Sequence, residues 1–580
     1  MLAQDIVGQA LNLARKTKRL KRVFQIAVIA FFCVLTFVTR CHNLRDVFIR
    51  GHIYFVDPDC YSRMTRVRMI TEHQGAIIKH QTFENWPKGV NSHATAPLDY
   101  LILGLAKVVS WTLRIADWRG SSVLKEQTLD VAGALISPLI GVAGALSLAA
   151  WAWAVRLRFW SMPLLLYAVS PILVHGTLLG RPDHQSLLML TVMVALGAEI
   201  ALANGGEEGA RVPLRTWGLV SGIAWAVSLW VSLYEPLILL GIVLSLWLAF
   251  DRRALCARAR LPGAAAFVLI LAAALLIEGW RIERPDAVML QYFPNWQRTI
   301  GELSHLDLRS ALLYHWLGWT VATAPFLMLW IRKTDRQLAP MLILLTCAVA
   351  LTVWQVRWGY FLAIIFVLVL PWQMPALRRP WIAWLVFLIS LWPVAQEWDG
   401  ELFPDEPMKE HDSIQRAEKV RLREVVLPMA GEGPFLAPWW LSPSIAYWTE
   451  DPGVAGSSHE GLSGIVDSAR FFLADNADDA GTILRAREVR WVLADDASRV
   501  IGTSAIILGV APPAKTMARI LAENAGEAPP FLHEMLQRRP QMPQYGAPLK
   551  FDDPSSALEA MPDWMTFYRV YSVDDAKLPR

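Results

Sequence analysis

The chain has 580 residues, of which 54% are hydrophobic and 27 are tryptophan, and its mean hydropathy is +0.34. This composition is too apolar for a soluble protein and too charged for a chain that lies wholly in lipid. The net charge of +4 comes from short basic clusters between apolar runs, which argues against a nucleic-acid-binding protein.

Eleven apolar segments are long enough to cross a bilayer as helices, and we expect 11 to 13 spans in all. The first follows the basic run RKTKRLKR and lacks a small-residue cleavage site, so it is predicted to be an anchor rather than a cleaved signal. The segments cover residues 22–40, 128–154, 159–179, 185–203, 214–232, 234–250, 262–280, 309–331, 338–355, 358–374 and 381–396.

The basic residues between these segments predict the orientation. With the N-terminus inside, each short loop that carries two or more Lys or Arg falls on the cytoplasmic side, as the positive-inside rule requires. These basic loops contain Arg156 and Arg158 and residues 204–215, 251–260, 332–337 and 376–380.

Residues 98–115 would break this pattern, because counting them as a crossing inverts every later loop. The segment is apolar but carries Lys107 and Arg114, so we predict a helix that lies in the outer face or re-enters it. The outside then receives three loops, at residues 41–127, 180–185 and 281–308, together with a turn that contains Glu235, for which the sequence suggests only a polar turn residue.

The five cysteines show no metal-ligand spacing, and no disulfide scaffold is implied. Cys41 and Cys60 could pair if their loop faces an oxidising compartment.

The character of the chain changes after residue 397. Residues 398–580 are rich in Pro, Asp and Glu, contain no spanning segment and include strand-like stretches such as VRWVLADD. We therefore predict a transmembrane catalytic domain over 1–397 and a soluble, extracytoplasmic α/β domain over 398–580.

Acidic residues gather on the predicted outer side. Asp57 and Asp59 lie in the first loop, Asp183 in the second and Glu302 in the third. Carboxylates that meet repel one another unless a cation neutralises them, and hard oxygen ligands suit Mg²⁺ or Mn²⁺. The alternative is that each is an ordinary solvated loop acid.

Six motifs in chain order resemble the oligosaccharyltransferase catalytic subunit and its single-chain bacterial and archaeal relatives, in the C-type glycosyltransferase superfamily. Any one of them is weak, but their order, sides and spacing hold over nearly the whole chain. The motifs are VDPDCYSRMTR (56–66), HQTFENWPKGVNSHATAPLDYL (80–101), GRPDHQ (180–185), TIGE (299–302), VRWGYFLA (356–363) and APWWLSPSIAYWTEDPGVA (437–455).

The resemblance implies a metal-dependent, inverting enzyme that moves a glycan from a lipid diphosphate donor to an acceptor, expected to be a polypeptide, at the outer face of a bacterial inner membrane. Asp57, with Asp59 as the competing assignment, would bind the metal and the nucleophile, and Asp183 would complete the metal site. Gln185 stands where relatives have a ligating histidine and could still offer a neutral oxygen.

The resemblance also assigns the substrate contacts. Glu302 would serve both the metal and the acceptor amide, although it could simply pair with Arg298. Arg357 would hold the donor diphosphate, although an arginine at a membrane interface is often only a snorkelling anchor. Trp439 and Trp440 would contact the acceptor.

The sequence departs from the family in the soluble domain. Leu441, Ser442 and Pro443 stand where relatives have the Asp-Tyr-Gly that follows the two tryptophans, so reading of an Asn-x-Ser/Thr sequon is in doubt. The nearest polar residues that could substitute, or could be plain loop and cap residues, are His459, Glu460 and Asp467.

Two rival functions stay open on sequence grounds. One is the same chemistry with a hydroxyl acceptor on a protein, lipid or glycan. The other is a non-enzymatic transporter of lipid-linked glycans, which would place its charges near the bilayer midplane rather than in external loops.

Overall fold

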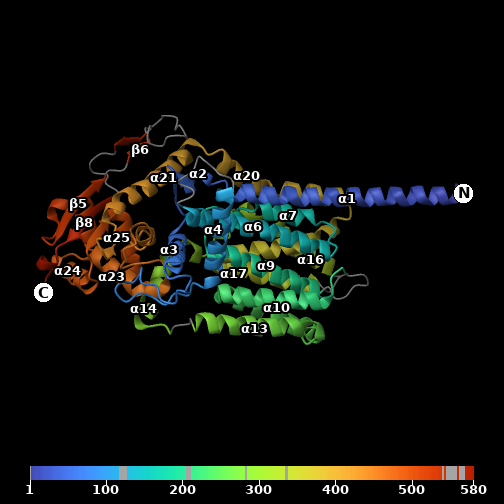
Figure 1. The fold of residues 1–580 in the computed structure, drawn as a ribbon, viewed down its shortest axis with the longest axis horizontal. Helices are drawn as coiled ribbons and strands as arrows, with labels where there is room; N and C mark the ends of the chain where they lie inside the picture. Colours follow the sequence, from blue (N-terminus) through green and yellow to red (C-terminus); the bar gives the residue numbers. More distant parts are fainter. Residues whose placement is uncertain are drawn as a thin grey trace.

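The structure is a computed structural model that describes residues 2–115, 127–203, 211–280, 284–332, 338–538, 541–543, 558–560 and 568–579. Parts of the predicted loops 41–127 and 281–308, of the basic loops 204–215 and 332–337, and of the C-terminal domain lie outside the described residues. Figure 1 shows a bundle of helices that run largely alongside α1, with the C-terminal domain at the end of the bundle opposite the N-terminus.

The polytopic helical architecture is confirmed. Seven described helices are long and apolar enough to cross a membrane, or eight if one bent pair counts as a single span. They lie in α1 (Leu2–Arg40), α4 (Ala96–Ile115), α6 (Thr128–Ala154), α9 (His184–Ala203), α10 (Leu214–Val231), α12 with α13 (Arg252–Leu255, Leu261–Glu278) and α18 (Gly359–Gln373). Shorter apolar helices lie between them, namely α11 (Tyr234–Phe250), α16 (Thr320–Arg332) and α17 (Leu338–Trp354).

Three segments predicted as continuous spans are broken in the structure. Residues 159–179 form α7 (Ser161–Val169) and α8 (Pro171–His175), because Pro171 forces Ser170 into an extended conformation. Residues 309–331 divide at Gly318, whose φ of 75° only glycine adopts readily, into α15 (Leu312–Leu317) and α16. The last segment forms α19 (Pro380–Ser390) and α20 (Trp392–Leu402), bent by 43°.

The first long loop contains α2 (Leu44–Val47), the two-residue strands β1 (Phe48–Ile49) and β2 (His52–Ile53), and α3 (Pro58–Glu72). Helix α4 begins beside α3, because Arg63 and Arg66 of α3 both pair with Asp99 of α4. Helix α6 begins at the same end of the bundle, where Asp130 accepts a hydrogen bond from Tyr447 of the C-terminal domain. The interfacial or re-entrant placement of α4 stays a prediction, since its length and composition would also allow a crossing.

The C-terminal region is the predicted α/β domain. Its four-stranded sheet has the order β3 (Phe435–Leu436), β4 (Trp491–Ala494), β8 (Tyr568–Val573) and β5 (Leu532–Arg538), with β3 and β4 parallel and the other pairs antiparallel. A separate pair, β6 (Gln541–Pro543) and β7 (Leu558–Ala560), is antiparallel. Helices cover the sheet, namely α21 (Glu406–Val426), α22 (Ser442–Thr449), α23 (Leu462–Leu473), α24 (Ala477–Ala486), α25 (Ala497–Leu508) and α26 (Met517–Glu523). Helix α20 runs across the predicted boundary at 397–398, and the division into two domains stays a prediction.

The C-terminal domain packs directly on the first loop. The ring of Tyr61 in α3 contacts those of Tyr447 and Trp448 in α22, with centroids 5.6 and 5.3 Å apart. Arg487 reaches from the domain to the backbone oxygen of Trp86 at 2.9 Å. Loop and domain therefore form one wall at the end of the helical bundle, and this wall contains the motifs at residues 56–66, 80–101 and 437–455.

Candidate active site

The first acidic motif is held by the start of α3. Asp57 is the N-cap, with its Oδ1 accepting from the backbone N–H of Cys60 at 3.0 Å, and Pro58 occupies the first helical position. The arginines of the same motif point elsewhere, because Arg63 and Arg66 bind buried Asp99 at 2.8 and 2.7 Å. These two arginines therefore hold the loop, and the carboxylate of Asp57 is left for the site. Cys60 is buried and, like Cys41, is a free thiol.

The other two acidic motifs meet Asp57 at Arg181, a residue for which the sequence predicted no role. The guanidinium of Arg181 lies 2.8 Å from Glu302 Oε1, 3.6 Å from Asp57 Oδ2 and 4.0 Å from Asp183 Oδ2. Arg181 stands inside the motif GRPDHQ, but two of its three partners, Asp57 and Glu302, lie more than 100 residues away in opposite directions along the chain. The expected convergence of the three loops is present, with an arginine at its centre.

Glu302 comes from the third loop, which contains α14 (Ala287–Trp296) and a short 3-10 helix over Gly301–Leu303. Its second oxygen accepts from Gln185 Nε2 at 3.2 Å. The suggested pair with Arg298 does not form in the described structure, where Glu302 pairs with Arg181.

The acids titrate differently because their surroundings differ. Asp59 is exposed on α3, yet desolvation by the surrounding protein, followed by the charges of Asp57 and Asp183, raises its pKa to about 6. Burial opposes the ionisation of Asp183, but His184 at 2.6 Å and Arg181 outweigh it and hold its pKa below the usual range. Burial likewise opposes the ionisation of Glu302, but Arg181 outweighs it and holds the pKa of that carboxyl below its usual value.

The residues present fit a divalent cation. We call Asp57, Asp59, Asp183 and Glu302 the acidic cluster. Three of these four carboxylates pair with the single guanidinium of Arg181, so their negative charge exceeds its positive charge. The Oε1 atom of Gln185 is buried and has no hydrogen-bond partner among the described residues. Carboxylate oxygens together with an unpaired amide oxygen are donors that Mg²⁺ and Mn²⁺ accept.

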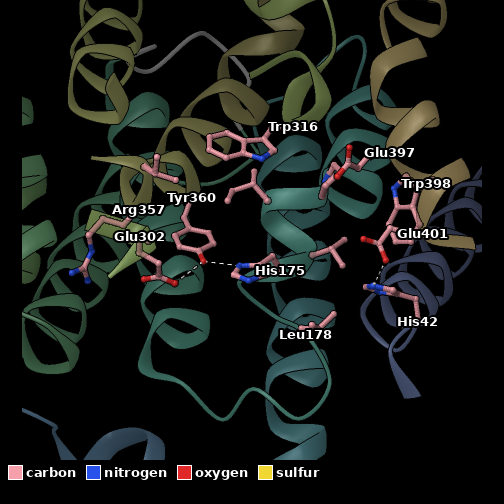
Figure 2. A pocket seen from close by; sticks show the side chains of 15 residues that line it. His42, His175, Leu178, Glu302, Trp316, Arg357, Tyr360, Glu397, Trp398 and Glu401 are labelled. Atoms are coloured by element: carbon pink, nitrogen blue, oxygen red, sulfur yellow. Dashed lines mark hydrogen bonds and ion pairs between the residues drawn. The ribbon is translucent and has the colours of Figure 1, made fainter. Parts of the chain in front are cut away.

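A cavity of about 440 Å³ opens beside Glu302. Figure 2 shows Glu302 and Arg357 at one end of it, Tyr360 and His175 in the middle, and His42 with Glu401 at the other end. The Tyr360 hydroxyl lies 3.4 Å from Glu302 and 2.8 Å from His175. The cavity also has Trp316 and Trp398 in its wall, so it offers both charged ends and aromatic faces.

Arg357 is fixed by a residue for which the sequence suggested no role. Its Nη2 lies 2.5 Å from Oε1 of Glu235, and that carboxylate is buried. Glu235 therefore fixes the guanidinium at the end of the cavity where Glu302 lies, which a snorkelling anchor would not need.

The sequence matches no protein-family model and no curated protein. Solved structures do match. The oligosaccharyltransferase of Archaeoglobus fulgidus, tethered to an acceptor peptide containing the NVT sequon, has a TM-score of 0.70 at 14% identity, over 95% of this chain and 89% of that chain. The chain has the C-type glycosyltransferase fold. The same archaeal protein in complex with an inhibitory peptide and a dolichol-phosphate has a TM-score of 0.66 at 13% identity, over 95% of this chain and 89% of that one. An arabinofuranosyltransferase from Mycobacteria has a TM-score of 0.51 at 16% identity, over 96% of this chain and 40% of that chain.

In this C-type glycosyltransferase fold, the two tryptophans of the C-terminal domain lie beside the third loop. Trp439 contacts Trp296 of α14, with ring centroids 5.9 Å apart, and Trp440 contacts Trp439. The Nε1 atoms of Trp439 and Trp440 are buried and have no partner among the described residues.

Ser442 and Asp467, two polar residues that follow the tryptophans, already bond to other groups of the chain. Ser442 is 1% exposed, and its hydroxyl donates to the carbonyls of Ala437 and Pro438. Asp467 binds Arg487 at 2.6 Å, so the suggestion that it could read an acceptor hydroxyl has no support in this geometry. His459 and Glu460 lie together near His93 of the first loop.

Proposed function

We propose that this chain is a membrane glycosyltransferase of the oligosaccharyltransferase type, which moves a glycan from a lipid diphosphate donor to a polypeptide at the outer face of a bacterial inner membrane, as a single subunit. The observation that carries the proposal is the meeting of three loop carboxylates around Arg181, one of which, Glu302, lines the same end of the cavity as Arg357. The direct test is transfer by the purified chain from lipid-linked glycans, extracted from the source membranes, to an acceptor peptide.

The proposed reaction is an inverting displacement. The acceptor nitrogen forms a bond to the anomeric carbon as the bond from that carbon to the diphosphate oxygen breaks, and the lipid diphosphate leaves with the electron pair. Asp57 and Glu302 orient the acceptor amide by accepting its N–H bonds, and a carboxylate of the cluster accepts the proton that the nitrogen loses. Arg357 neutralises the charge that grows on the leaving diphosphate.

Asp57, Asp183, Glu302 and Gln185 would hold a Mn²⁺ or Mg²⁺ ion, with Asp59 as the alternative to Asp57. Such an ion would neutralise these oxygens and keep them fixed toward the acceptor. Arg181 binds Glu302 at 2.8 Å and so holds that carboxylate in a fixed position.

Transfer to a hydroxyl acceptor is the second candidate function. It is favoured because Leu441 replaces the Asp that reads the sequon in relatives, and because the hydroxyl of Ser442 already bonds to backbone carbonyls. The transporter alternative is weaker, because the acidic cluster lies in the loops at the end of the bundle that faces the C-terminal domain.

Arg357→Ala should raise the apparent KM for the lipid donor by about 10- to 100-fold, and Arg357→Lys should give an intermediate value, because lysine keeps the charge but loses the two-pronged hydrogen bond. Glu235→Gln should raise the same KM less, since it releases the guanidinium without removing it. Donor titrations at fixed peptide measure all three, with exposed Arg519→Ala as the matched control. A defect seen only when the peptide is varied would place Arg357 on the acceptor side.

The acceptor is expected not to follow the usual sequon rule. A site built to bond a substrate hydroxyl can reject the analogue lacking it by about 10⁴-fold. Here Leu441, which follows the tryptophans, has no side-chain oxygen, and the hydroxyl of Ser442 is buried and donates to backbone carbonyls. Asn-Ala-Thr and Asn-Ala-Ala peptides, assayed with native donor, should therefore differ by less than about 10-fold. A strong preference for the threonine peptide that survives Ser442→Ala, His459→Gln and Glu460→Gln would contradict this account of the acceptor site.

A further inference from the structure

A second group of ligating side chains lies between the first loop and the C-terminal domain, apart from the acidic cluster. His93 belongs to the loop between α3 and α4, whereas His459 and Glu460 belong to a 3-10 helix over His459–Gly461. One ligand atom from each of the three side chains lies within 4.8 Å of the other two. We call these three residues the histidine cluster.

Glu460 is the centre of the histidine cluster. Its Oε1 accepts from the backbone N–H of His93 at 2.8 Å and lies 2.9 Å from His93 Nδ1 and 3.5 Å from His459 Nε2. The carboxylate is nearly buried, at 9% exposure, and the backbone bond fixes its direction. A rigid oxygen is therefore aimed between two imidazoles.

A simple ion pair with Glu460 does not account for the positions of both imidazole rings, His93 and His459. Their ring centroids are 4.7 Å apart with the planes tilted by 32°, and both rings are reachable from solvent, with side-chain exposures of 51% and 35%. A single carboxylate needs only one histidinium partner, and the second ring at this distance would repel the first if both were charged. A metal ion bound to both rings replaces that repulsion with shared coordination.

The donor set selects the class of metal. Two imidazole nitrogens and one carboxylate oxygen match the three protein ligands of an open tetrahedral zinc site, with the fourth position left for water. Imidazole favours Zn²⁺ over Mg²⁺, which prefers sets made only of oxygens, and Mn²⁺ binds a mixed nitrogen and oxygen set more weakly than Zn²⁺ does. The histidine cluster and the acidic cluster should therefore take different ions.

We propose that His93, His459 and Glu460 bind a Zn²⁺ ion that ties the first loop to the C-terminal domain beside the active site. The ion closes a link between residues 367 positions apart in the chain. His184, which binds Asp183 at 2.6 Å, lies near His93, with ring centroids 6.4 Å apart. The link thus ends next to the acidic cluster without sharing its ligands, and it stands whether or not the chain transfers a glycan.

The test is zinc binding by the full-length chain in detergent. The protein is stripped with EDTA, dialysed into excess Mg²⁺ to fill the acidic cluster, titrated with Zn²⁺ and analysed for bound metal after desalting. Wild type should retain one zinc ion per chain, and His93→Gln and His459→Gln should each weaken binding at least about 10-fold. Substitution with Co²⁺ should give the visible absorption of a tetrahedral site in wild type but not in His93→Gln or His459→Gln.

The controls separate this site from the rest of the protein. His73→Gln removes an exposed histidine from the same loop, and Asp57→Asn disables the acidic cluster; both should keep wild-type zinc binding. His93 is half exposed, so His93→Gln keeps the test valid if His459→Gln does not fold. Wild-type zinc binding in both histidine variants, or a loss in Asp57→Asn as large as in His459→Gln, would overturn the proposal.

Discussion

Glu302→Gln is expected to reduce glycosyl transfer by at least about 10³-fold while the chain remains folded in the membrane. The carboxylate bonds Arg181 at 2.8 Å and Gln185 at 3.2 Å, and in the proposed mechanism it also orients the acceptor. The glutamine keeps the shape but removes the charge, so both the metal and the acceptor amide lose their partner. Asp57→Asn should have a similar effect, measured as the initial rate with native donor and excess peptide.

Glu523→Gln is the matched control for this prediction. Glu523 is an exposed acid that pairs with Arg519 at 3.7 Å in the C-terminal domain, so the same change of charge there should leave the rate unchanged. Transfer by Glu302→Gln within about 10-fold of wild type would remove Glu302 from the mechanism.

Removing divalent metal should abolish transfer, and adding Mn²⁺ should restore it. Asp57, Asp183 and Glu302 share the one guanidinium of Arg181, so without a second cation the acids repel one another and lose the arrangement that holds the acceptor. The rate is measured after EDTA treatment and dialysis, with and without added Mn²⁺. Full activity after exhaustive chelation would mean that Arg181 alone neutralises the cluster.

Gln185→His sharpens this test of the metal. A histidine at this position, as in the relatives that the sequence resembles, would exchange a neutral oxygen for a stronger nitrogen ligand and lower the Mn²⁺ concentration for half-maximal activity. An unchanged metal requirement in this variant would place Gln185 outside the metal site.

The sequence predicted those parts of the molecule that depend on local pattern. Apolar runs indicated most of the helices, and VRWVLADD indicated the strand β4 (Trp491–Ala494). The order of the motifs indicated that Asp57, Asp183 and Glu302 would meet, and they do so around one guanidinium. The break before Pro171 could also have been read from the sequence, because proline disfavours a helical residue before it.

The partners of charged side chains could not be predicted from local pattern. Arg181 was visible in the motif, but its contact with Glu302 joins residues 121 positions apart. Glu235 looked like a turn residue because Arg357, which it binds, comes from a different helix boundary. Nothing in the spacing of Arg63 and Arg66 indicated that both would bind Asp99 instead of a substrate. Ion pairs of this kind depend on how the helices pack, which periodicity does not specify.

The most direct test of the proposed function is mass spectrometry of exported and membrane proteins from cells that carry either the wild-type chain or the Asp57→Asn variant. The account predicts glycan-modified peptides in the wild-type cells, their loss in the variant cells, and accumulation there of the lipid diphosphate-linked glycan. Identical peptide modification and identical lipid-linked glycan pools in the two strains would contradict it.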